Sequence, residues 1–260
     1  MQILLCQLAI ENLAPEKNRA RVLEHLRGIK FHPPSLLILP ELFSLGTLSE
    51  GFDPEKAESI RLEDQDFLAK LSSENGIHVI GSSIGFQGNT LQNESLHFDS
   101  AGKLRGSYRK IHPFTLGGED LIFNSGTEIV TWELGGFAVQ PAICYDLRFP
   151  EIFRAGLRRG ATFIVVQANW PESRQAHWEI LLRARAIENQ CYVAGVNCLG
   201  MQRGTRYAGG SLLITPKGEI VVSAGSEEGL FTAETDPQTV FAWRKSFPAL
   251  TDRKPLGFWA

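Results

Sequence analysis

The stretch GFAVQPAICYD, residues 136–146, is an apolar run that ends abruptly in polar side chains. Its hydrophobicity is continuous rather than alternating, which is typical of a strand that is covered on both faces. The segment that follows, DLRFPEIFRAGLRRG, has Pro150 where a helix would begin and continues as an amphipathic pattern to Arg159. A buried strand followed by a helix predicts a layered α/β architecture.

The same alternation recurs along the rest of the chain. Continuous apolar runs predict strands at 35–43, 77–84, 162–170 and 191–197. Helical periodicity lies between them, and the predicted buried faces contain Val22, Leu23, Leu26 and Ile29 in segment 15–30, Phe67, Leu68 and Leu71 in segment 64–75, and Trp178, Leu181, Leu182 and Ala186 in segment 174–190. The expected fold class is therefore α/β.

The two ends of the chain add further strands. Residues 1–10, MQILLCQLAI, predict a first strand. Residues 209–225 contain two β runs joined by Pro-Lys-Gly, which is a hairpin signature, and residues 229–236 add one more strand, so we expect a mixed sheet. No linker, low-complexity tract or repeat divides the sequence, and a single domain over residues 1–260 is the simplest interpretation.

Composition excludes several classes of protein. With 260 residues, 43% of them hydrophobic, the chain can bury a large core as a soluble protein. A formal net charge of -3 with only short basic clusters argues against nucleic acid or a membrane surface as a partner. The N-terminal segment lacks a positive leader and turns polar at Glu11, too soon to cross a bilayer.

The cysteines and histidines favour a cytoplasmic protein without a cofactor. The four cysteines, Cys6, Cys144, Cys191 and Cys198, form no CxxC pair, and we expect free thiols in a reducing cytosol. The six histidines show no HExxH motif and no spacing suited to zinc, so no metal is expected. Nucleotide-binding motifs such as GxxxxGK[ST] are also absent, and no cofactor is predicted.

Three predicted strands stop at a polar residue beside a proline or an aromatic. The segments LILPE, PAICYD and VVQANWP end in this way and supply Glu41, Cys144 and Asn169. In layered α/β folds the carboxyl ends of the strands form the ligand crevice. These three residues are therefore the first candidates for a functional site.

Cys144 precedes the predicted helix start, where amide dipoles would favour its thiolate. A free thiol has a pKa near ~8.5, so it needs a nearby base or cation in order to act as a nucleophile at neutral pH. The alternative is a small residue that fills the core, which is the commoner role of a cysteine in an apolar run. The polar residues that follow Cys144 favour the nucleophile.

Three charged residues could serve such a nucleophile. Glu41 follows an apolar strand, where an unpaired carboxylate could take a proton from a thiol or water, although a helix-start carboxylate or one paired with arginine fits equally. Lys110, beside apolar residues in GSYRKIHPF, could stabilise an oxyanion or a thiolate, or could be an exposed hairpin lysine. Glu119 could orient Lys110 or cap a turn.

Two other patterns are weaker. GSSIG at 81–85 matches the G-x-S-x-G pattern of serine hydrolases, but a strand rather than a helix is expected next, so Ser83 is predicted to be a strand residue. His112 could pair with Cys144 as in papain-like enzymes, yet no papain-type cysteine signature surrounds either residue.

The ordered segments LPELF, YRKIHPF followed by GGED, and CYDLRFPE resemble the Glu-Lys-Cys signature of the nitrilase superfamily of carbon-nitrogen hydrolases. The similarity extends over essentially the whole chain, through ANWP, LLRARAIENQCYVAGVN and GGSLLITPKGE, and is greatest to the ω-amidase branch. The resemblance implies an αββα sandwich with four layers, usually paired through helices into a homodimer or larger homo-oligomer.

The resemblance also implies the site residues. Cys144 would be the nucleophile, Glu41 the general base, Lys110 the oxyanion stabiliser and Glu119 a supporting glutamate. The chemistry would be acyl transfer through a thioester, with the backbone N–H of Tyr145 as a second oxyanion donor.

An ω-amidase substrate, such as a 2-oxo dicarboxylic acid monoamide, also needs a contact for its distal carboxylate. The arginines nearest to the site motifs are Arg148, Arg174 and Arg206, and we expect Arg148 and Arg174 to bind substrate together with Asn169, although Arg148 could also be structural. The expected walls of the pocket are Phe43, Phe114 and Trp170.

Two alternatives to an ω-amidase remain open from sequence. The first is hydrolysis of N-carbamoyl amines or of a deaminated glutathione amide by the same residues in a different pocket. The second is a binding or redox-sensing protein that uses Cys144 as a reactive thiol without catalysis.

Overall fold

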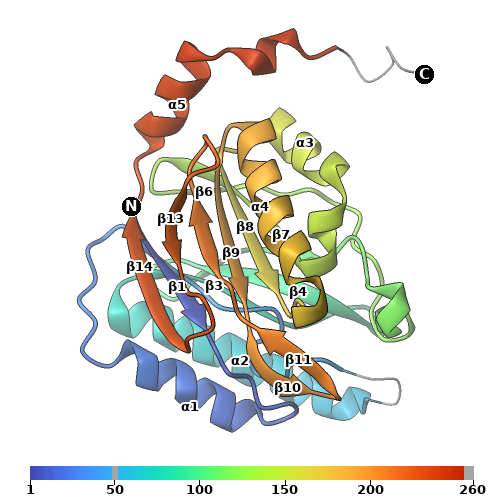
Figure 1. Cartoon of the computed structure of the whole chain (residues 1–260). Coiled ribbons are helices and arrows are strands. Elements are labelled where there is room, and N and C mark those ends of the chain that lie inside the picture. The colour runs from blue at the N-terminus through green and yellow to red at the C-terminus, as the bar shows by residue number, and fades with distance from the viewer. Residues whose placement is uncertain (49–51, 255–260) are drawn as a thin grey trace.

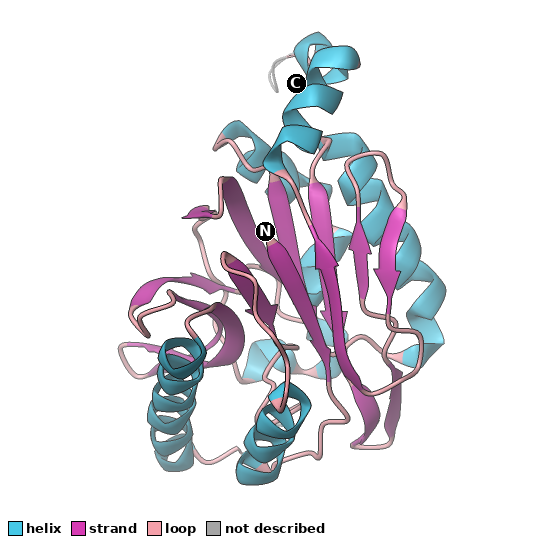
Figure 2. Ribbon diagram, turned by 90° about the vertical axis from the view of Figure 1, so that its left-hand side faces the viewer, coloured by secondary structure: helices cyan, strands magenta, loops and turns pink. Residues whose placement is uncertain are grey.

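A computed structural model of the chain describes residues 1–48 and 52–254. Two six-stranded sheets face each other, and helices cover their outer faces (Figure 1). The strand order is β14-β1-β2-β3-β4-β5 in the first sheet and β13-β12-β9-β8-β7-β6 in the second. The view in Figure 2 shows the strands between helices on either side, so the predicted four-layer α/β sandwich is confirmed.

Parallel strands at the centre of each sheet are flanked by antiparallel ones. The strands of the first sheet are β1 (Gln2–Gln7), β2 (Ser35–Ile38), β3 (His78–Gln87), β4 (Thr90–Phe98), β5 (Leu104–Arg109) and β14 (Gly229–Glu234). The strands of the second sheet are β6 (Trp132–Leu134), β7 (Phe137–Ile143), β8 (Phe163–Ala168), β9 (Tyr192–Asn197), β12 (Leu212–Ile214) and β13 (Ile220–Ser223). A separate hairpin is formed by β10 (Leu199–Gln202) and β11 (Thr205–Ala208).

The helices bury most of the apolar residues that the sequence predicts, although α1 ends at Leu26, before the predicted Ile29, and two other differences are present. The α-helices are α1 (Pro15–Leu26), α2 (Pro54–Asn75), α3 (Pro150–Arg158), α4 (Gln175–Asn189) and α5 (Pro237–Ser246). Helix α2 begins ten residues before the predicted segment 64–75. Leu23, predicted to be buried on α1, is 46% exposed, because the helix turns only Val22 and Leu26 fully into the core.

Side-chain alternation divides the core into two main parts. On β1 and β2, Ile3, Leu5, Leu36 and Ile38 point between the sheets, whereas their neighbours Leu4, Cys6, Leu37 and Leu39 pack with the residues of α1 and α2. Each sheet is therefore covered on both faces, which is the reason for the continuous apolar runs. The predicted hairpin between 209 and 225 is confirmed as β12 and β13.

Strand direction brings distant parts of the sequence to one end of the sandwich. β5 runs in the same direction as β2, because β2 pairs in parallel with β3 and two antiparallel pairings then lead through β4 to β5. In the second sheet β7 and β8 are parallel. The carboxyl ends of β2, β5, β7 and β8 are followed by Glu41, Lys110, Cys144 and Asn169, respectively.

A buried glutamine connects the two sheets near that end. Gln167 on β8 donates from Nε2 to the carbonyl of Leu39 at 2.7 Å and accepts a hydrogen bond from Ser95 Oγ on β4 at 2.5 Å. All three residues are fully buried, so these bonds are shielded from water. They hold the end of β2 against the end of β8.

The packing of α4 on β9 depends on a glycine. A Cβ added at Gly195 would lie 2.4 Å from Leu182 Cδ1 and 2.8 Å from Trp178 Cζ2. We expect Gly195→Ala to lower the free energy of unfolding by about 1–3 kcal/mol through overpacking. Leu182→Ala alone should cost about 2–5 kcal/mol. Urea unfolding measures both values.

The double variant Gly195→Ala/Leu182→Ala provides the control. Because the new methyl group enters space that Leu182 vacates, the double variant should lose at least ~1 kcal/mol less than the sum of the single losses. Additive losses, agreeing within about 0.5 kcal/mol, would contradict this close approach of α4 to β9.

Candidate active site

A cavity of about 380 Å³ lies at the strand ends. Glu41, Lys110, Glu119 and Cys144 all line it, so the structure brings together the four residues that the sequence picks out. Lys110 is 2% exposed and Glu41 4% exposed, so neither is an ordinary surface charge. The interpretation of Lys110 as an exposed hairpin lysine is therefore wrong.

The ammonium group of Lys110 lies between the two glutamates. Its Nζ is 2.7 Å from Glu41 Oε1, 2.8 Å from Glu119 Oε1 and 2.7 Å from Glu119 Oε2. Burial alone would lower the pKa of Lys110, but the charges of Glu119 and Glu41 outweigh it and hold that pKa well above its ordinary value. Lys110 is therefore a fixed cation in this site.

Glu119 is positioned by its loop and by the same cation. It begins a 3₁₀ helix, η2 (Glu119–Leu121), after Gly118, and its Oε2 accepts a hydrogen bond from the backbone N–H of Phe114 at 2.7 Å. Burial alone would raise the pKa of Glu119, but Lys110 outweighs it, and the net pKa is lowered. Both members of the pair are therefore charged at neutral pH.

Glu41 is not the unpaired carboxylate expected from the sequence. Besides Lys110, it accepts hydrogen bonds from Asn93 Nδ2 at 2.8 Å and from the backbone N–H of Asn169 at 2.9 Å. These contacts come from β4, β5 and the end of β8, so both sheets hold the carboxylate in place. Only an oxygen fixed in this way can be aimed reproducibly at a thiol.

Cys144 adopts a strained backbone at the end of β7. Its φ of 45° lies in the left-handed region, which is unusual for a residue other than glycine and recurs at functional sites. Its Sγ lies 3.7 Å from the carbonyl oxygen of Asn169. Burial raises the pKa of Cys144 well above its ordinary value, and the charge of Glu41 and a hydrogen bond with it add to burial.

The thiol of Cys144 is thus protonated in the resting site. Burial and two nearby carboxylates outweigh Lys110 and any effect of the amide dipoles at the helix start, so the thiol needs a base in order to act as a nucleophile. Cys144 begins the 3₁₀ helix η3 (Cys144–Arg148), so the backbone N–H of Tyr145 is among those that have no acceptor inside the helix. Pro150 begins α3 directly afterwards, as predicted.

The turn that carries Cys144 is held by Asp146, a residue to which the sequence analysis gave no role. Its fully buried carboxylate accepts from Tyr108 Oη at 2.7 Å and from the backbone N–H groups of Ile143 and His112, both at 3.0 Å. His112 Nδ1 also lies 2.9 Å from it. A charged residue directly after Cys144 and Tyr145, at the end of an apolar run, is the feature of the sequence that could have indicated this role.

Aromatic rings and guanidinium groups also line the cavity. The predicted residues Phe114, Arg148, Asn169, Trp170 and Arg174 all line it. Arg148 Cζ lies 4.7 Å from the ring centroid of Trp170, and Arg174 Cζ lies 5.7 Å from that of Phe114. Each of these cations therefore rests on an aromatic face.

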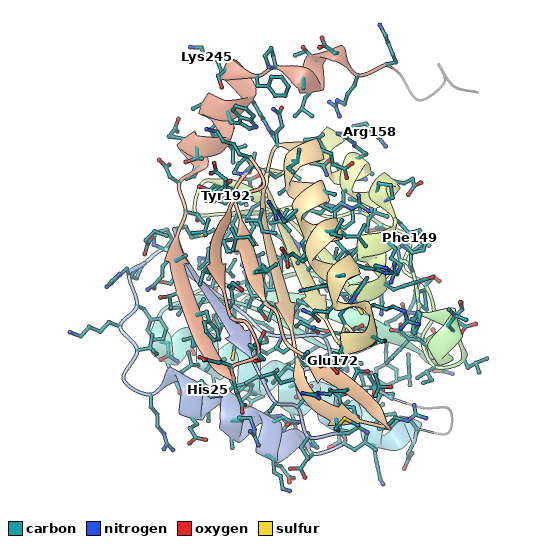
Figure 3. All side chains as sticks on the ribbon, viewed as in Figure 1. His25, Phe149, Arg158, Glu172, Tyr192 and Lys245 are labelled. Atoms are coloured by element: carbon teal, nitrogen blue, oxygen red, sulfur yellow. The ribbon has the colours of Figure 1, made fainter. Side chains whose placement is uncertain are left out.

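One predicted contact with the substrate is wrong, and Arg206, an arginine near the site motifs in sequence, does not line the cavity either. Phe43 does not line the cavity. Its ring is fully buried against α2, where it stacks on Phe67 with 5.8 Å between centroids. The turn after Glu41 directs it there. Arg206 on β11 is exposed and pairs with Glu172, which Figure 3 labels near the β10–β11 hairpin.

The weaker sequence patterns have structural explanations. Ser83 lies within β3, as predicted, and donates to Asp64 of α2 at 2.6 Å. His112 stacks on Phe149 and pairs with Asp146 rather than with Cys144. In the described ranges no cluster of three or more His, Cys, Asp or Glu is arranged to hold a metal ion.

No helix in the described part of the chain combines the length and apolar character needed to cross a membrane.

Comparison with known sequences identifies the class of protein. The profile of the carbon-nitrogen hydrolase family matches residues 3–245. The chain therefore belongs to the carbon-nitrogen hydrolase family, the nitrilase superfamily, as the sequence motifs predict.

Individual relatives narrow the class to amidases. The chain is similar to a 2-oxoglutaramate amidase of Bacillus subtilis, with 39% identity over 223 residues that cover 85% of this chain and 86% of the relative. A carbon-nitrogen hydrolase superfamily protein of Xanthomonas campestris, solved with an arsenic adduct in its active site, superposes with a TM-score of 0.86 at 30% identity, covering 98% of both chains.

A third relative carries a modified cysteine. An amidase variant from Nesterenkonia sp. AN1 was solved with acrylamide added at its active-site cysteine; it has a TM-score of 0.78 at 25% identity and covers 96% of this chain and 99% of its own.

The contacts of Asp146 yield a prediction about the nucleophile turn. Asp146→Ala removes the acceptor of two backbone N–H groups and the Tyr108 hydroxyl, and each buried donor left unpaired costs about 1–3 kcal/mol. We expect a loss of several kcal/mol in the free energy of unfolding, measured in urea. The exposed Asp120→Ala should change it by less than about 0.5 kcal/mol. Equal stabilities of the two variants would contradict the role of Asp146.

Proposed function

We propose that this chain is an ω-amidase-like enzyme that hydrolyses the terminal amide of a small carboxylated substrate, such as 2-oxoglutaramate, to the acid and ammonia through a cysteine thioester. The observation that carries the proposal is the contact of a protonated, buried thiol with Glu41, beside the Lys110 cation, in a cavity that Arg148 and Arg174 also line. Similarity to a 2-oxoglutaramate amidase supports the substrate class.

In the first half of the reaction, Glu41 takes the proton of Cys144 as the sulfur attacks the amide carbon. A carbon–sulfur bond forms, and the carbonyl π electrons move onto oxygen. The backbone N–H of Tyr145 and the ammonium of Lys110 stabilise the resulting oxyanion. Collapse of the intermediate breaks the carbon–nitrogen bond, and the leaving nitrogen takes the proton from Glu41 to depart as ammonia.

In the second half, the acyl group remains on Cys144 as a thioester. Glu41, again a carboxylate, takes a proton from water as the water oxygen attacks the thioester carbon. The carbon–sulfur bond breaks, the departing sulfur takes the proton from Glu41 to restore the thiol, and the carboxylic acid leaves. One carboxylate thus serves both halves, which requires that it stay in a fixed orientation.

The distal carboxylate of the substrate requires a cation at the other end of the cavity. Arg148 and Arg174 supply two, and the aromatic faces beneath them limit their motion. Guanidinium groups suit a carboxylate because their N–H groups form a planar fork. We propose these two arginines as the carboxylate contact and Asn169 as a further lining residue.

A substrate panel tests the proposal. Ammonia release should be faster from 2-oxoglutaramate than from N-carbamoyl amines or deaminated glutathione, and Cys144→Ser should abolish it with an unchanged circular dichroism spectrum. Cys191→Ala is the matched control, since this thiol is also buried but lies beside the backbone of Ala161 and Asn189. If the enzyme prefers another amide, the proposed substrate class is wrong. If Cys144→Ser still releases ammonia, the proposed mechanism is wrong.

Substitution of the arginines tests the carboxylate contact separately. Arg148→Gln and Arg174→Gln should each raise KM for 2-oxoglutaramate about tenfold, the size expected for the loss of a charged hydrogen bond. A neutral amide of similar length, such as butyramide, should be unaffected. Steady-state kinetics of both substrates decide the point, and equal effects on the two would reject the assignment.

We also propose a homodimer or larger homo-oligomer in the cytoplasm, as expected of the ω-amidase branch. Light scattering coupled to size-exclusion chromatography measures the assembly.

A further inference from the structure

We propose that Asn93 is a positioning residue that allows Lys110 to exchange one of its carboxylate contacts for the oxyanion. The inference rests on the proposed amidase function, in which Lys110 stabilises that oxyanion. It concerns a buried strand residue that touches both glutamates of the site.

The resting contacts of Lys110 leave it no free proton. An ammonium group has three N–H donors. One points to Glu41 Oε1 and two to the oxygens of Glu119, at distances from 2.7 to 2.8 Å. When the sulfur of Cys144 adds to the substrate carbonyl and the π electrons move onto oxygen, Lys110 can donate to that oxygen only by giving up one of these bonds.

Glu119 is the partner that can release a bond. It receives two of the three, and each of its oxygens has a second donor in place. Oε1 accepts from Asn93 Nδ2 at 3.0 Å, and Oε2 accepts from the backbone N–H of Phe114 at 2.7 Å. A buried carboxylate oxygen that loses all its donors is costly. Because Asn93 and the backbone of Phe114 still donate to Glu119, Glu119 can lose a bond from Lys110 without leaving a buried oxygen unpaired.

Asn93 acts on Glu41 at the same time. Its Nδ2 lies 2.8 Å from Glu41 Oε1, so the two N–H groups of one carboxamide are divided between two carboxylates. While Lys110 moves toward the substrate, Asn93 keeps Glu41 in the orientation that it needs for the thiol and later for water.

The orientation of Asn93 is itself fixed. Its Oδ1 accepts from Ser82 Oγ at 3.2 Å, and Ser82 Oγ accepts from the backbone N–H of Leu42 at 3.0 Å. A flipped carboxamide would direct its oxygen at two carboxylates, so the network selects one orientation. The backbone carbonyl of Asn93 also accepts from the N–H of Lys110 at 2.9 Å, which ties the two residues together.

Two substitutions of Asn93 distinguish the loss of its hydrogen bonds from the addition of a negative charge. Asn93→Ala removes the bridge, and Asn93→Asp keeps its shape but adds a third carboxylate. For Asn93→Ala we expect kcat to fall about 10- to 100-fold, as for the loss of charged hydrogen bonds, with KM changed less than about threefold. Asn93→Asp should lose more, because it repels both glutamates. Circular dichroism and thermal unfolding check that both variants fold.

The pH profile is a readout that a merely structural role would not move. Asn93 donates to the charged form of Glu119 and contributes to its lowered pKa. Without that donor the pKa of Glu119 rises, and the acidic limb of the kcat/KM profile should shift to higher pH. An unshifted limb in Asn93→Ala would overturn the proposal, as would an unchanged kcat.

Gln92 provides a matched control on the same strand. Its carboxamide is also fully buried, but neither its Oε1 nor its Nε2 has a hydrogen-bond partner within the described residues. Gln92→Met preserves the approximate volume and should leave kcat and the pH profile unchanged. A fall in kcat like that of Asn93→Ala would show a general sensitivity of β4 and overturn the specific role.

A readout without substrate distinguishes this inference from the proposed function. Alkylation of Cys144 by iodoacetamide, followed by mass spectrometry across pH, reports on the same charged groups. If the wild-type chain releases no ammonia from any amide, the proposed function fails. In that case the alkylation profile still tests the role of Asn93. A shift of its acidic limb to higher pH in Asn93→Ala supports the positioning role, and coincident profiles of the variant and the wild type overturn it.

Discussion

The structure depends on a buried ammonium group held between two carboxylates. Removing these charges from water is costly, and their mutual attraction offsets the cost only if the remaining lone pairs are satisfied. Here the additional donors come from Asn93, from the backbone of Phe114 and from the backbone of Asn169. These groups belong to β4 of one sheet, a loop and the end of β8 in the other sheet. The site therefore requires both sheets to be assembled in register.

The balance of charge in this cluster determines the state of the thiol. Two carboxylates outnumber one ammonium, so the surroundings of Cys144 disfavour a third anion beyond what burial does. A cysteine paired with a histidine is activated in the opposite way, since a positive partner stabilises the thiolate. Under the proposed mechanism, the proton of Cys144 would stay in place until a substrate arrives, and Glu41 would then accept it. A protonated thiol is also protected from adventitious oxidation.

The site residues that could be predicted from the sequence lie at the ends of strands and helices. Those that could not be predicted lie inside strands and helices. Glu41, Lys110, Cys144 and Asn169 follow strands, where a change from apolar to polar residues is visible. Asn93 lies within β4, whose polar residues are almost all buried, a combination that demands partners which only the folded chain identifies. Asp146 acts through backbone groups and a distant tyrosine. The misplacement of Phe43 has a similar origin, because the direction of a side chain in the turn after Glu41 depends on its packing with α2.

Charges of both signs line the cavity and could orient a carboxylated substrate. Glu41 and Glu119 carry one more charge than Lys110 between them, and Arg148 and Arg174 add guanidinium groups to the same lining. Under the proposed function, the carboxylate of a substrate would be repelled by the two glutamates and attracted by the two arginines. Its neutral amide would then be directed toward Cys144. Arg148 and Arg174 lie over the rings of Trp170 and Phe114, and Phe114 also donates its backbone N–H to Glu119. Under the proposed function, substrate choice and chemistry would therefore rest on different side chains that are joined through Phe114.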